Sequence, residues 1–111
     1  MARLSPDYLT RPTKQLIDEA ATLTRPFPPR STSSRVEHGI PPRFAASCTP
    51  ALMRHVAQLA TDAGAIVQTH LAETIPECEW IESLFDGTRY TDVYHSMGLL
   101  GQRTLLGHGI Y

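Results

Sequence analysis

The segment with the clearest capacity for chemistry is His70-Leu71-Ala72-Glu73, in which an imidazole and a carboxylate lie three residues apart. A neutral imidazole can bind a divalent metal ion, and a carboxylate in the same cavity can carry the proton of an attacking water. The alternative is structural: a buried histidine bonded to the backbone, followed by a glutamate whose charge favours the start of a helix. The spacing alone leaves both interpretations open.

Two further groups could take part in a site. His108 lies between Gly107 and Gly109, and glycines allow a close approach of ligand or backbone, although they equally suit an ordinary turn. Arg43-Phe44 could hold a planar heterocycle, because a guanidinium donates hydrogen bonds and an aromatic ring stacks. The competing interpretation of this pair is a surface arginine beside a core phenylalanine.

The remaining histidines and cysteines are expected to be structural. We predict surface or helix-face positions for His38, His55 and His95. Cys48 and Cys78 lack both a C-x-x-C spacing and a neighbouring base, which predicts inert thiols. Two cysteines are too few for a disulfide-stapled secreted domain, so a reducing, cytoplasmic location is expected.

The elements that must position these residues alternate between strand and helix from Arg43 onward. Residues 44–46 are predicted to form a short strand, and residues 65–71 a buried parallel strand. Between them we expect an amphipathic helix with Thr49 as its N-cap, Pro50 in its first turn and Gly64 at its end.

A second helix is expected after Thr74, where Thr74-Ile75-Pro76-Glu77 matches a capping box. It should end at Gly87 and bury Trp80, Ile81, Leu84 and Phe85. Thr91 or Asp92 should cap a short helix that reaches Gly98, and residues 104–108 should form the next strand. Upstream, Thr13–Leu23 has helical spacing, and residues 25–42 form an irregular Pro/Ser-rich loop.

This alternation predicts an α/β fold with a parallel sheet, either an open doubly wound sheet or an arc of a (β/α)₈ barrel. His70 and His108 each end a predicted strand, and barrel enzymes place their chemistry at that end, which favours the barrel. With 111 residues, the chain is expected to form at most one small domain.

Composition argues against several classes of partner. The net charge is −1 and the arginines are scattered, so we expect no nucleic acid and no anionic membrane as a partner. No apolar run approaches the roughly 18 residues of a membrane span, and the N-terminus lacks the apolar stretch of a signal peptide.

Several motifs together resemble the guanine deaminases, zinc-dependent members of the amidohydrolase superfamily. In chain order they are Ser5-Pro6-Asp7-Tyr8-Leu9, Pro42-Arg43-Phe44-Ala45, Gln68-Thr69-His70-Leu71-Ala72-Glu73, Asp92-Val93-Tyr94, Leu99-Leu100 and Gly107-His108-Gly109-Ile110-Tyr111. The resemblance implies that residues 1–111 are part of an amidohydrolase-related catalytic domain. The expected fold is then a partial (β/α)₈ barrel of the metal-dependent hydrolase type, about strands three to six.

The resemblance also implies roles for individual residues. His70 would bind the single zinc ion and, with Glu73, touch the substrate, and Glu73 would act as the acid/base. Arg43 and Phe44 would hold guanine, and His108 would position and polarise the attacking water. The implied reaction is hydrolysis of guanine to xanthine and ammonia in purine catabolism, by a parent enzyme expected to be a homodimer.

Two features of the sequence keep other hypotheses open. The resemblance implies four protein ligands for zinc, and the chain supplies His70 but no His-x-His pair. In addition, residues 33–41 offer little to bury before the Pro-Arg-Phe segment, which predicts a truncated strand there. We therefore expect the chain itself to be inactive. The alternatives are a metal-free, non-catalytic remnant, or a different amidohydrolase that acts on another aminated heterocycle or a chlorinated triazine.

Overall fold

The computed structural model describes residues 10–30 and 35–111. The motif Ser5–Leu9 and part of the Pro/Ser-rich loop lie outside the described residues. In chain order the elements are α1 (Thr13–Thr24), β1 (Gly39–Ile40), the 3-10 helix η2 (Ala45–Ser47), α2 (Pro50–Ala63), β2 (Ile66–Leu71), α3 (Ile75–Leu84), α4 (Tyr90–Ser96) and β3 (Thr104–His108).

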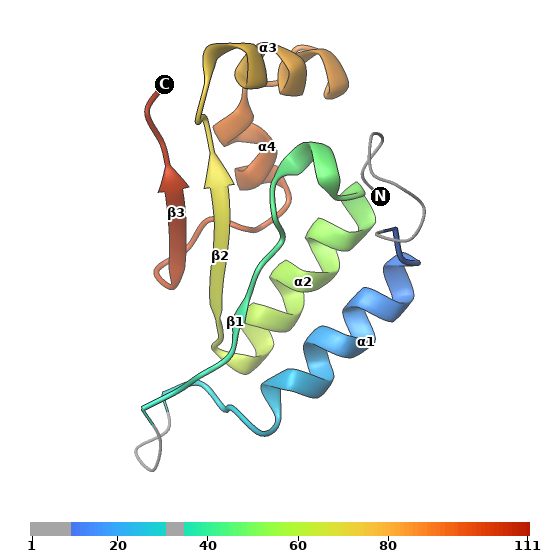
Figure 1. Cartoon of the computed structure of the whole chain (residues 1–111), viewed down its shortest axis with the longest axis vertical. Helices are drawn as coiled ribbons and strands as arrows, with labels where there is room; N and C mark the ends of the chain where they lie inside the picture. Colours follow the sequence, from blue (N-terminus) through green and yellow to red (C-terminus); the bar gives the residue numbers. More distant parts are fainter. Residues whose placement is uncertain (1–9, 31–34) are drawn as a thin grey trace.

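The strands form a parallel sheet in the order β1-β2-β3 (Figure 1). Helix α2 connects β1 to β2, and α3 and α4 connect β2 to β3. In the register, His70 on β2 pairs with Gly107 on β3, and Leu71 pairs with His108. The sheet therefore brings the carboxyl ends of β2 and β3 to the same edge, as the sequence predicts.

The central strand β2 is covered on one face. Val67, Thr69 and Leu71 are buried, whereas Ile66, Gln68 and His70 are half-buried. Thr69 bonds Tyr94 of α4, which identifies the buried face as the one that packs on the helices. Because side chains alternate along a strand, His70 points to the opposite face.

Helix α2 forms as predicted. The Thr49 hydroxyl accepts a hydrogen bond from the Leu52 amide, Pro50 begins the helix, and Gly64 follows it with a left-handed φ of 69°. Its buried face carries Leu52, Met53, Val56, Ala57 and Ala60. The prediction for α1 is also confirmed, and this helix packs along α2 (Figure 1).

The strand predicted at residues 44–46 is wrong. Phe44 is the N-cap of η2 and Ala45 and Ala46 belong to it, whereas β1 lies earlier, at Gly39–Ile40. Pro41 and Pro42 lack a backbone N–H and cannot continue the ladder as donors, although the Arg43 carbonyl still accepts from the His70 amide at 3.2 Å. The expectation that this stretch buries little is wrong for Ile40, which is 1% exposed.

The cap predicted for α4 is also wrong. The helix begins at Tyr90 after Arg89, and no side chain caps it. Tyr90 is buried and bonds Glu77, so tertiary contacts fix the first turn ahead of Thr91 and Asp92.

Helix α3 differs from the prediction in three respects. Among its apolar residues Ile81 is fully buried, whereas Trp80, Leu84 and Phe85 are half-buried. Only one of the two hydrogen bonds of a capping box is present. The Thr74 hydroxyl accepts from the Glu77 amide, but the Glu77 carboxylate bonds Tyr90 instead of the Thr74 amide. The helix also ends earlier than predicted, at Leu84 with Phe85 as its C-cap, and the Gly87 amide bonds the Glu82 carbonyl at 2.7 Å beyond this end.

An ion pair ties the loop before β1 to the start of β3. The Glu37 carboxylate accepts the Arg30 backbone N–H at 2.8 Å and pairs with the Arg103 guanidinium. The Arg30 bond and the Arg103 charge hold the pKa of the Glu37 carboxyl below its usual value. This contact lies at the end of the sheet opposite His70 and His108, where barrel proteins place stabilising rather than catalytic groups.

Other sequence predictions concern isolated side chains. His55 and His95 are exposed, as predicted, but His38 is half-buried beside β1. Cys48 and Cys78 are free and half-buried, and burial raises the pKa of the Cys78 thiol, which fits an inert group. None of the helices within residues 10–30 and 35–111 has the length and apolar character needed to cross a bilayer.

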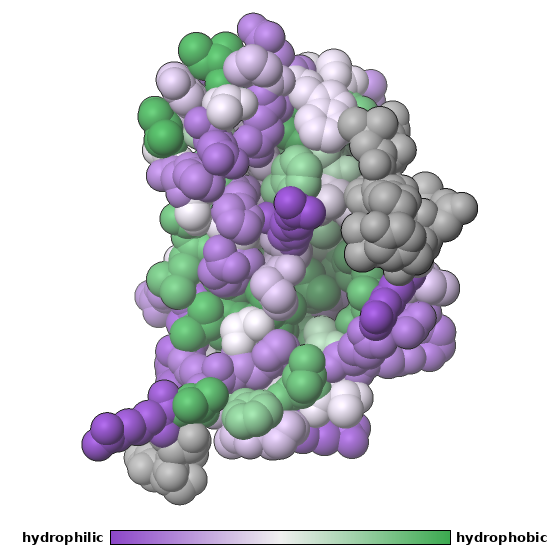
Figure 2. Space-filling model, in the orientation of Figure 1, coloured by the Kyte–Doolittle hydropathy of each residue, from purple (hydrophilic) through white to green (hydrophobic). Residues whose placement is uncertain are grey.

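The edge strand β3 is the least covered part of the sheet. Leu105 and Leu106 on this strand are 58% and 42% exposed, and Ile110 and Tyr111 beyond it are also exposed. Figure 2 shows apolar surface along the side of the molecule where β3 lies. Parallel sheets are normally covered on both faces, so β3 departs from the usual pattern.

Candidate active site

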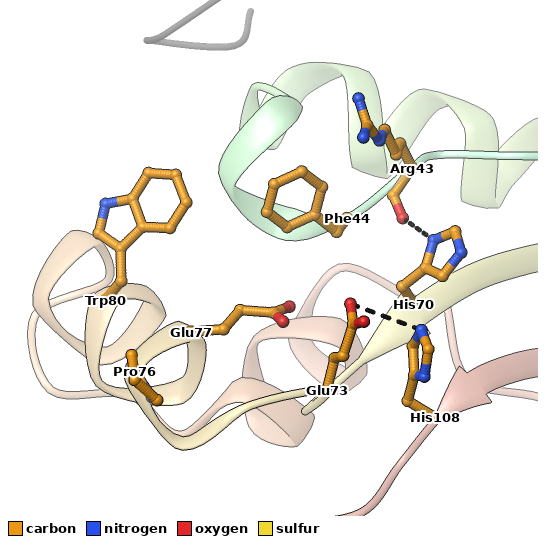
Figure 3. Close-up of a pocket in the computed structure, with 8 residues that line it drawn as sticks. All are labelled: Arg43, Phe44, His70, Glu73, Pro76, Glu77, Trp80 and His108. Atoms are coloured by element: carbon orange, nitrogen blue, oxygen red, sulfur yellow. Dashed lines mark hydrogen bonds and ion pairs between the residues drawn. The ribbon is translucent and has the colours of Figure 1, made fainter.

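A pocket of about 460 Å³ lies at the carboxyl end of the sheet. It gathers all five residues that the sequence singled out: Arg43, Phe44, His70, Glu73 and His108 (Figure 3). Arg43 and Phe44 follow β1, His70 and Glu73 come from the end of β2 and the loop after it, and His108 ends β3. Parallel strands place their carboxyl ends together, which explains how residues 65 positions apart in the chain meet.

The imidazole of His70 is oriented by the backbone. Its Nδ1 lies 2.7 Å from the carbonyl oxygen of Arg43 (Figure 3). A carbonyl only accepts hydrogen bonds, so Nδ1 carries the hydrogen and the neutral ring keeps its lone pair on Nε2. A histidine held in this way is typical of metal-binding sites, in which the second ring nitrogen binds the metal ion.

A buried hydrogen-bond network holds the backbone of His70. Tyr94, which is 1% exposed, donates its hydroxyl hydrogen to the His70 carbonyl at 2.6 Å. The Tyr94 hydroxyl also lies 3.0 Å from that of Thr69, which in turn donates to the Arg43 carbonyl at 3.3 Å. Burial raises the pKa of Tyr94, so the phenol remains a donor. The sequence analysis did not predict this role for Tyr94.

Two residues with positive φ lie at the strand ends from which Glu73 and His108 enter the pocket. Ala72 follows β2 with a φ of 50°, and His108 ends β3 with a φ of 70°. The left-handed region is costly for residues other than glycine and is concentrated at functional sites. With these turns, Nε2 of His108 lies 3.5 Å from a Glu73 oxygen, and its ring centroid lies 5.7 Å from that of His70.

Gly107 leaves space for this close packing. A Cβ atom at this position would lie 3.0 Å from Cδ2 of His70. The pairing of Gly107 with His70 in the register puts any such side chain on the face that carries the imidazole. The glycine before His108 therefore makes room for the His70 ring.

Aromatic and cationic groups form the wall of the pocket beside Phe44. The rings of Phe44 and Trp80 meet edge to face, with centroids 6.2 Å apart. The guanidinium carbon of Arg43 lies 5.8 Å from the centroid of the Phe44 ring. Such a surface combines ring faces with hydrogen-bond donors and suits a planar heterocycle.

Helix α3 supplies three pocket residues that the sequence analysis missed, namely Pro76, Glu77 and Trp80. The Glu77 carboxylate accepts the hydroxyl hydrogen of Tyr90 at 2.7 Å. Burial, together with this bond, raises the pKa of Tyr90 far above its usual value, so its phenol also remains a donor. The spacing of Pro76, Glu77 and Trp80 by three to four residues along α3 was the available signal for a shared face.

The residues that the structure describes do not make a complete metal site. They include no group of three or more His, Cys, Asp or Glu side chains placed to hold one ion. A catalytic zinc ion requires about three protein ligands. His70 fits one ligand position, because its Nδ1 is already bonded and its Nε2 keeps the lone pair.

Comparison with known proteins identifies the family. The amidohydrolase family model matches residues 2–111. The chain belongs to the amidohydrolase family. Guanine deaminase from Dictyostelium discoideum is 36% identical over 115 aligned residues, which cover 100% of this chain and 25% of that protein. 8-Oxoguanine deaminase from Pseudomonas aeruginosa is 32% identical and matches 97% of the chain and 24% of its own length.

The structural comparison agrees with this family. A crystal structure of guanine deaminase from C. acetobutylicum with guanine in its active site superimposes with a TM-score of 0.89 and 31% identity, covering 100% of this chain and 26% of that one. The predicted resemblance and the predicted partial (β/α)₈ barrel are therefore confirmed. This amidohydrolase chain spans about a quarter of the length of the relatives it matches.

Proposed function

We propose that this chain provides the substrate-binding and proton-transfer part of a hydrolytic guanine deaminase. The observation that carries the proposal is that Arg43, Phe44, His70, Glu73 and His108 line one pocket at the carboxyl end of the sheet. Similarity to guanine deaminases along the whole chain supports guanine as the substrate.

In the proposed reaction, water adds to C2 of guanine, the bond from C2 to the amino group breaks, and ammonia and xanthine are released. Glu73 takes a proton from the attacking water and delivers it to the purine. His108, 3.5 Å from Glu73, helps to position and polarise that water. Arg43 and Phe44 hold the ring by hydrogen bonding and stacking. The reaction would serve purine catabolism.

We further propose that His70 supplies one ligand to a zinc ion. When bound, zinc would lower the pKa of a water to about 7 and so make a nucleophile available at neutral pH. The remaining ligands must come from outside the described residues, since these offer no group of three. We therefore expect the 111-residue chain alone to release no ammonia from guanine.

The test is to measure ammonia release, xanthine formation and zinc content for the full gene product, with the Arg43→Ala variant. His70 bonds the backbone carbonyl of Arg43, which the substitution keeps, so zinc content should be unchanged while kcat/KM for guanine falls about tenfold or more. Arg54→Ala, which removes an exposed arginine from α2, is the matched control. Equal loss of zinc and turnover would contradict the substrate role of Arg43.

The same assay separates the alternatives. The similarity to 8-oxoguanine deaminase makes 8-oxoguanine the competing substrate, and its kcat/KM should be compared directly with that of guanine. A full gene product that binds no zinc and deaminates neither purine would instead be a non-catalytic remnant. A cytoplasmic location and a homodimer are part of the proposal, and the mass of the protein in solution tests the second.

A further inference from the structure

Glu77 places a second carboxylate in the pocket, separate from the proposed acid/base Glu73. Figure 3 shows its side chain extending from α3 toward the space between Phe44 and Glu73. The usual structural role of a glutamate at this position is to bond back to the first turn of its own helix. Here the carboxylate turns away from that turn and lines the pocket instead.

The geometry leaves part of this carboxylate available to a ligand. One oxygen accepts the hydroxyl hydrogen of Tyr90 at 2.7 Å, and Tyr90 is 4% exposed, so the side chain is anchored from the protein interior. A carboxylate has two oxygens and about four acceptor positions. The second oxygen can therefore accept a hydrogen bond from a molecule in the pocket without giving up the bond to Tyr90.

The pocket combines this acceptor with a donor. The Arg43 guanidinium can only donate, and the ionised Glu77 carboxylate can only accept. Phe44 and Trp80 provide ring faces beside these two groups. Together the groups fit a flat heterocycle that presents a carbonyl or ring nitrogen on one edge and an N–H group on another.

We propose that Glu77 is a specificity-determining residue whose carboxylate accepts a hydrogen bond from a ring N–H of the bound heterocycle. The proposal rests on the proposed function for its substrate class, the aminated purines. It assigns Tyr90 the part of a positioning residue that holds Glu77 in place. A purine whose ring N–H is replaced by N–CH₃ at the recognised position offers no hydrogen to the second carboxylate oxygen and is rejected.

Binding can be measured on the 111-residue chain without any turnover. Trp80 is the only tryptophan and lines the pocket, so its fluorescence reports occupancy directly. The ligands are guanine and its 1-methyl, 7-methyl and 9-methyl derivatives, each of which blocks a different ring nitrogen. The variants are Glu77→Gln and, as a matched control, Glu79→Gln, which makes the same charge change at an exposed position of α3.

For the unchanged chain we expect guanine to bind more tightly than the derivative methylated at the recognised nitrogen. Glu77→Gln should weaken guanine binding about tenfold or more, yet leave the affinity for that derivative within about twofold. An amide has one acceptor oxygen where the carboxylate has two, so with that oxygen bonded to Tyr90 the ring N–H would face an N–H donor. A general disturbance of the pocket would weaken all four ligands alike. Glu79→Gln should change none of them.

The two proposals fail differently. If the unchanged chain binds none of the four purines, the proposed substrate class is wrong. If it binds guanine but Glu77→Gln retains the full penalty of each methyl group, the role of Glu77 is wrong and the proposed function stands. Glu77→Asp keeps the charge but withdraws it by one methylene, and it supplies the same comparison if Glu77→Gln lowers the melting temperature markedly.

Discussion

Replacing Tyr94 with phenylalanine tests whether the buried hydroxyl network holds the backbone of the candidate site. The substitution keeps the ring, which is 1% exposed and packed in the core, and removes only the hydroxyl. The variant therefore loses the 2.6 Å hydrogen bond to the His70 carbonyl and the 3.0 Å contact with the Thr69 hydroxyl. The change therefore isolates polar contacts from packing.

The expected loss follows from which partners remain. The Tyr90 hydroxyl lies 3.4 Å from the His70 carbonyl, but it donates its one hydrogen to Glu77 at 2.7 Å. Thr69 keeps its bond to the Arg43 carbonyl at 3.3 Å. Neither contact is short, so most of the cost of leaving a buried acceptor poorly bonded, about 1–3 kcal/mol, should be felt. We expect the free energy of unfolding to fall by about 2 kcal/mol and Tm to fall by about 8 °C.

Chemical denaturation monitored by circular dichroism measures this change. Tyr111→Phe is the matched control, because Tyr111 is 67% exposed and its hydroxyl should contribute under about 0.5 kcal/mol. A Tyr94→Phe variant as stable as Tyr111→Phe would refute the argument. A double-mutant cycle with Thr69→Val should show a coupling of at least about 0.5 kcal/mol, and strict additivity would mean that the two hydroxyls act independently.

Three further changes have definite expectations. Gly107→Ala puts a methyl group 3.0 Å from the His70 ring and should destabilise the protein by about 1–3 kcal/mol and shift the His70 NMR resonances. Unshifted resonances would show that the site accommodates the methyl group. Thr49→Ala removes the N-cap of α2 and should lower the free energy of unfolding by about 1 kcal/mol. Thr91→Ala should lower it by under about 0.5 kcal/mol, since the Thr91 side chain does not cap α4, and equal losses in chemical denaturation would contradict these cap assignments. The lowered pKa of the Glu37 carboxyl stabilises the fold above its unfolded value near 4.5, and this contribution should disappear as the pH falls through the folded value. In Glu37→Gln the free energy of unfolding, measured by denaturation between about pH 2 and 6, should therefore depend less on pH than in the unchanged chain. Parallel pH profiles for the two proteins would contradict the stabilising role of Glu37.

Local sequence signals were sufficient for elements whose ends are set by a single residue. Thr49, Pro50 and Gly64 mark the ends of α2 because a hydroxyl, a ring and a missing Cβ act on their own neighbouring backbone. The strands β2 and β3 were likewise predictable from short apolar runs. Where a contact from elsewhere in the chain competes, these signals failed, as with Tyr90 at the start of α4 and the strand at Gly39–Ile40.

The chemistry-bearing residues follow the same division. The sequence by itself identified Arg43, Phe44, His70, Glu73 and His108 by residue type. The order of the predicted strands placed His70, Glu73 and His108 at one edge of the sheet, because the carboxyl ends of parallel strands lie at the same edge. Only the tertiary structure decided which nitrogen of His70 is bonded, since its partner is a carbonyl 27 residues away. It also decided that Glu77 and Trp80 face the pocket, because the hydroxyl that turns Glu77 away from its own helix comes from Tyr90 on another helix. Hydrogen bonds within a helix turn can be inferred from spacing, but those between elements depend on packing that brings distant residues within about 3 Å.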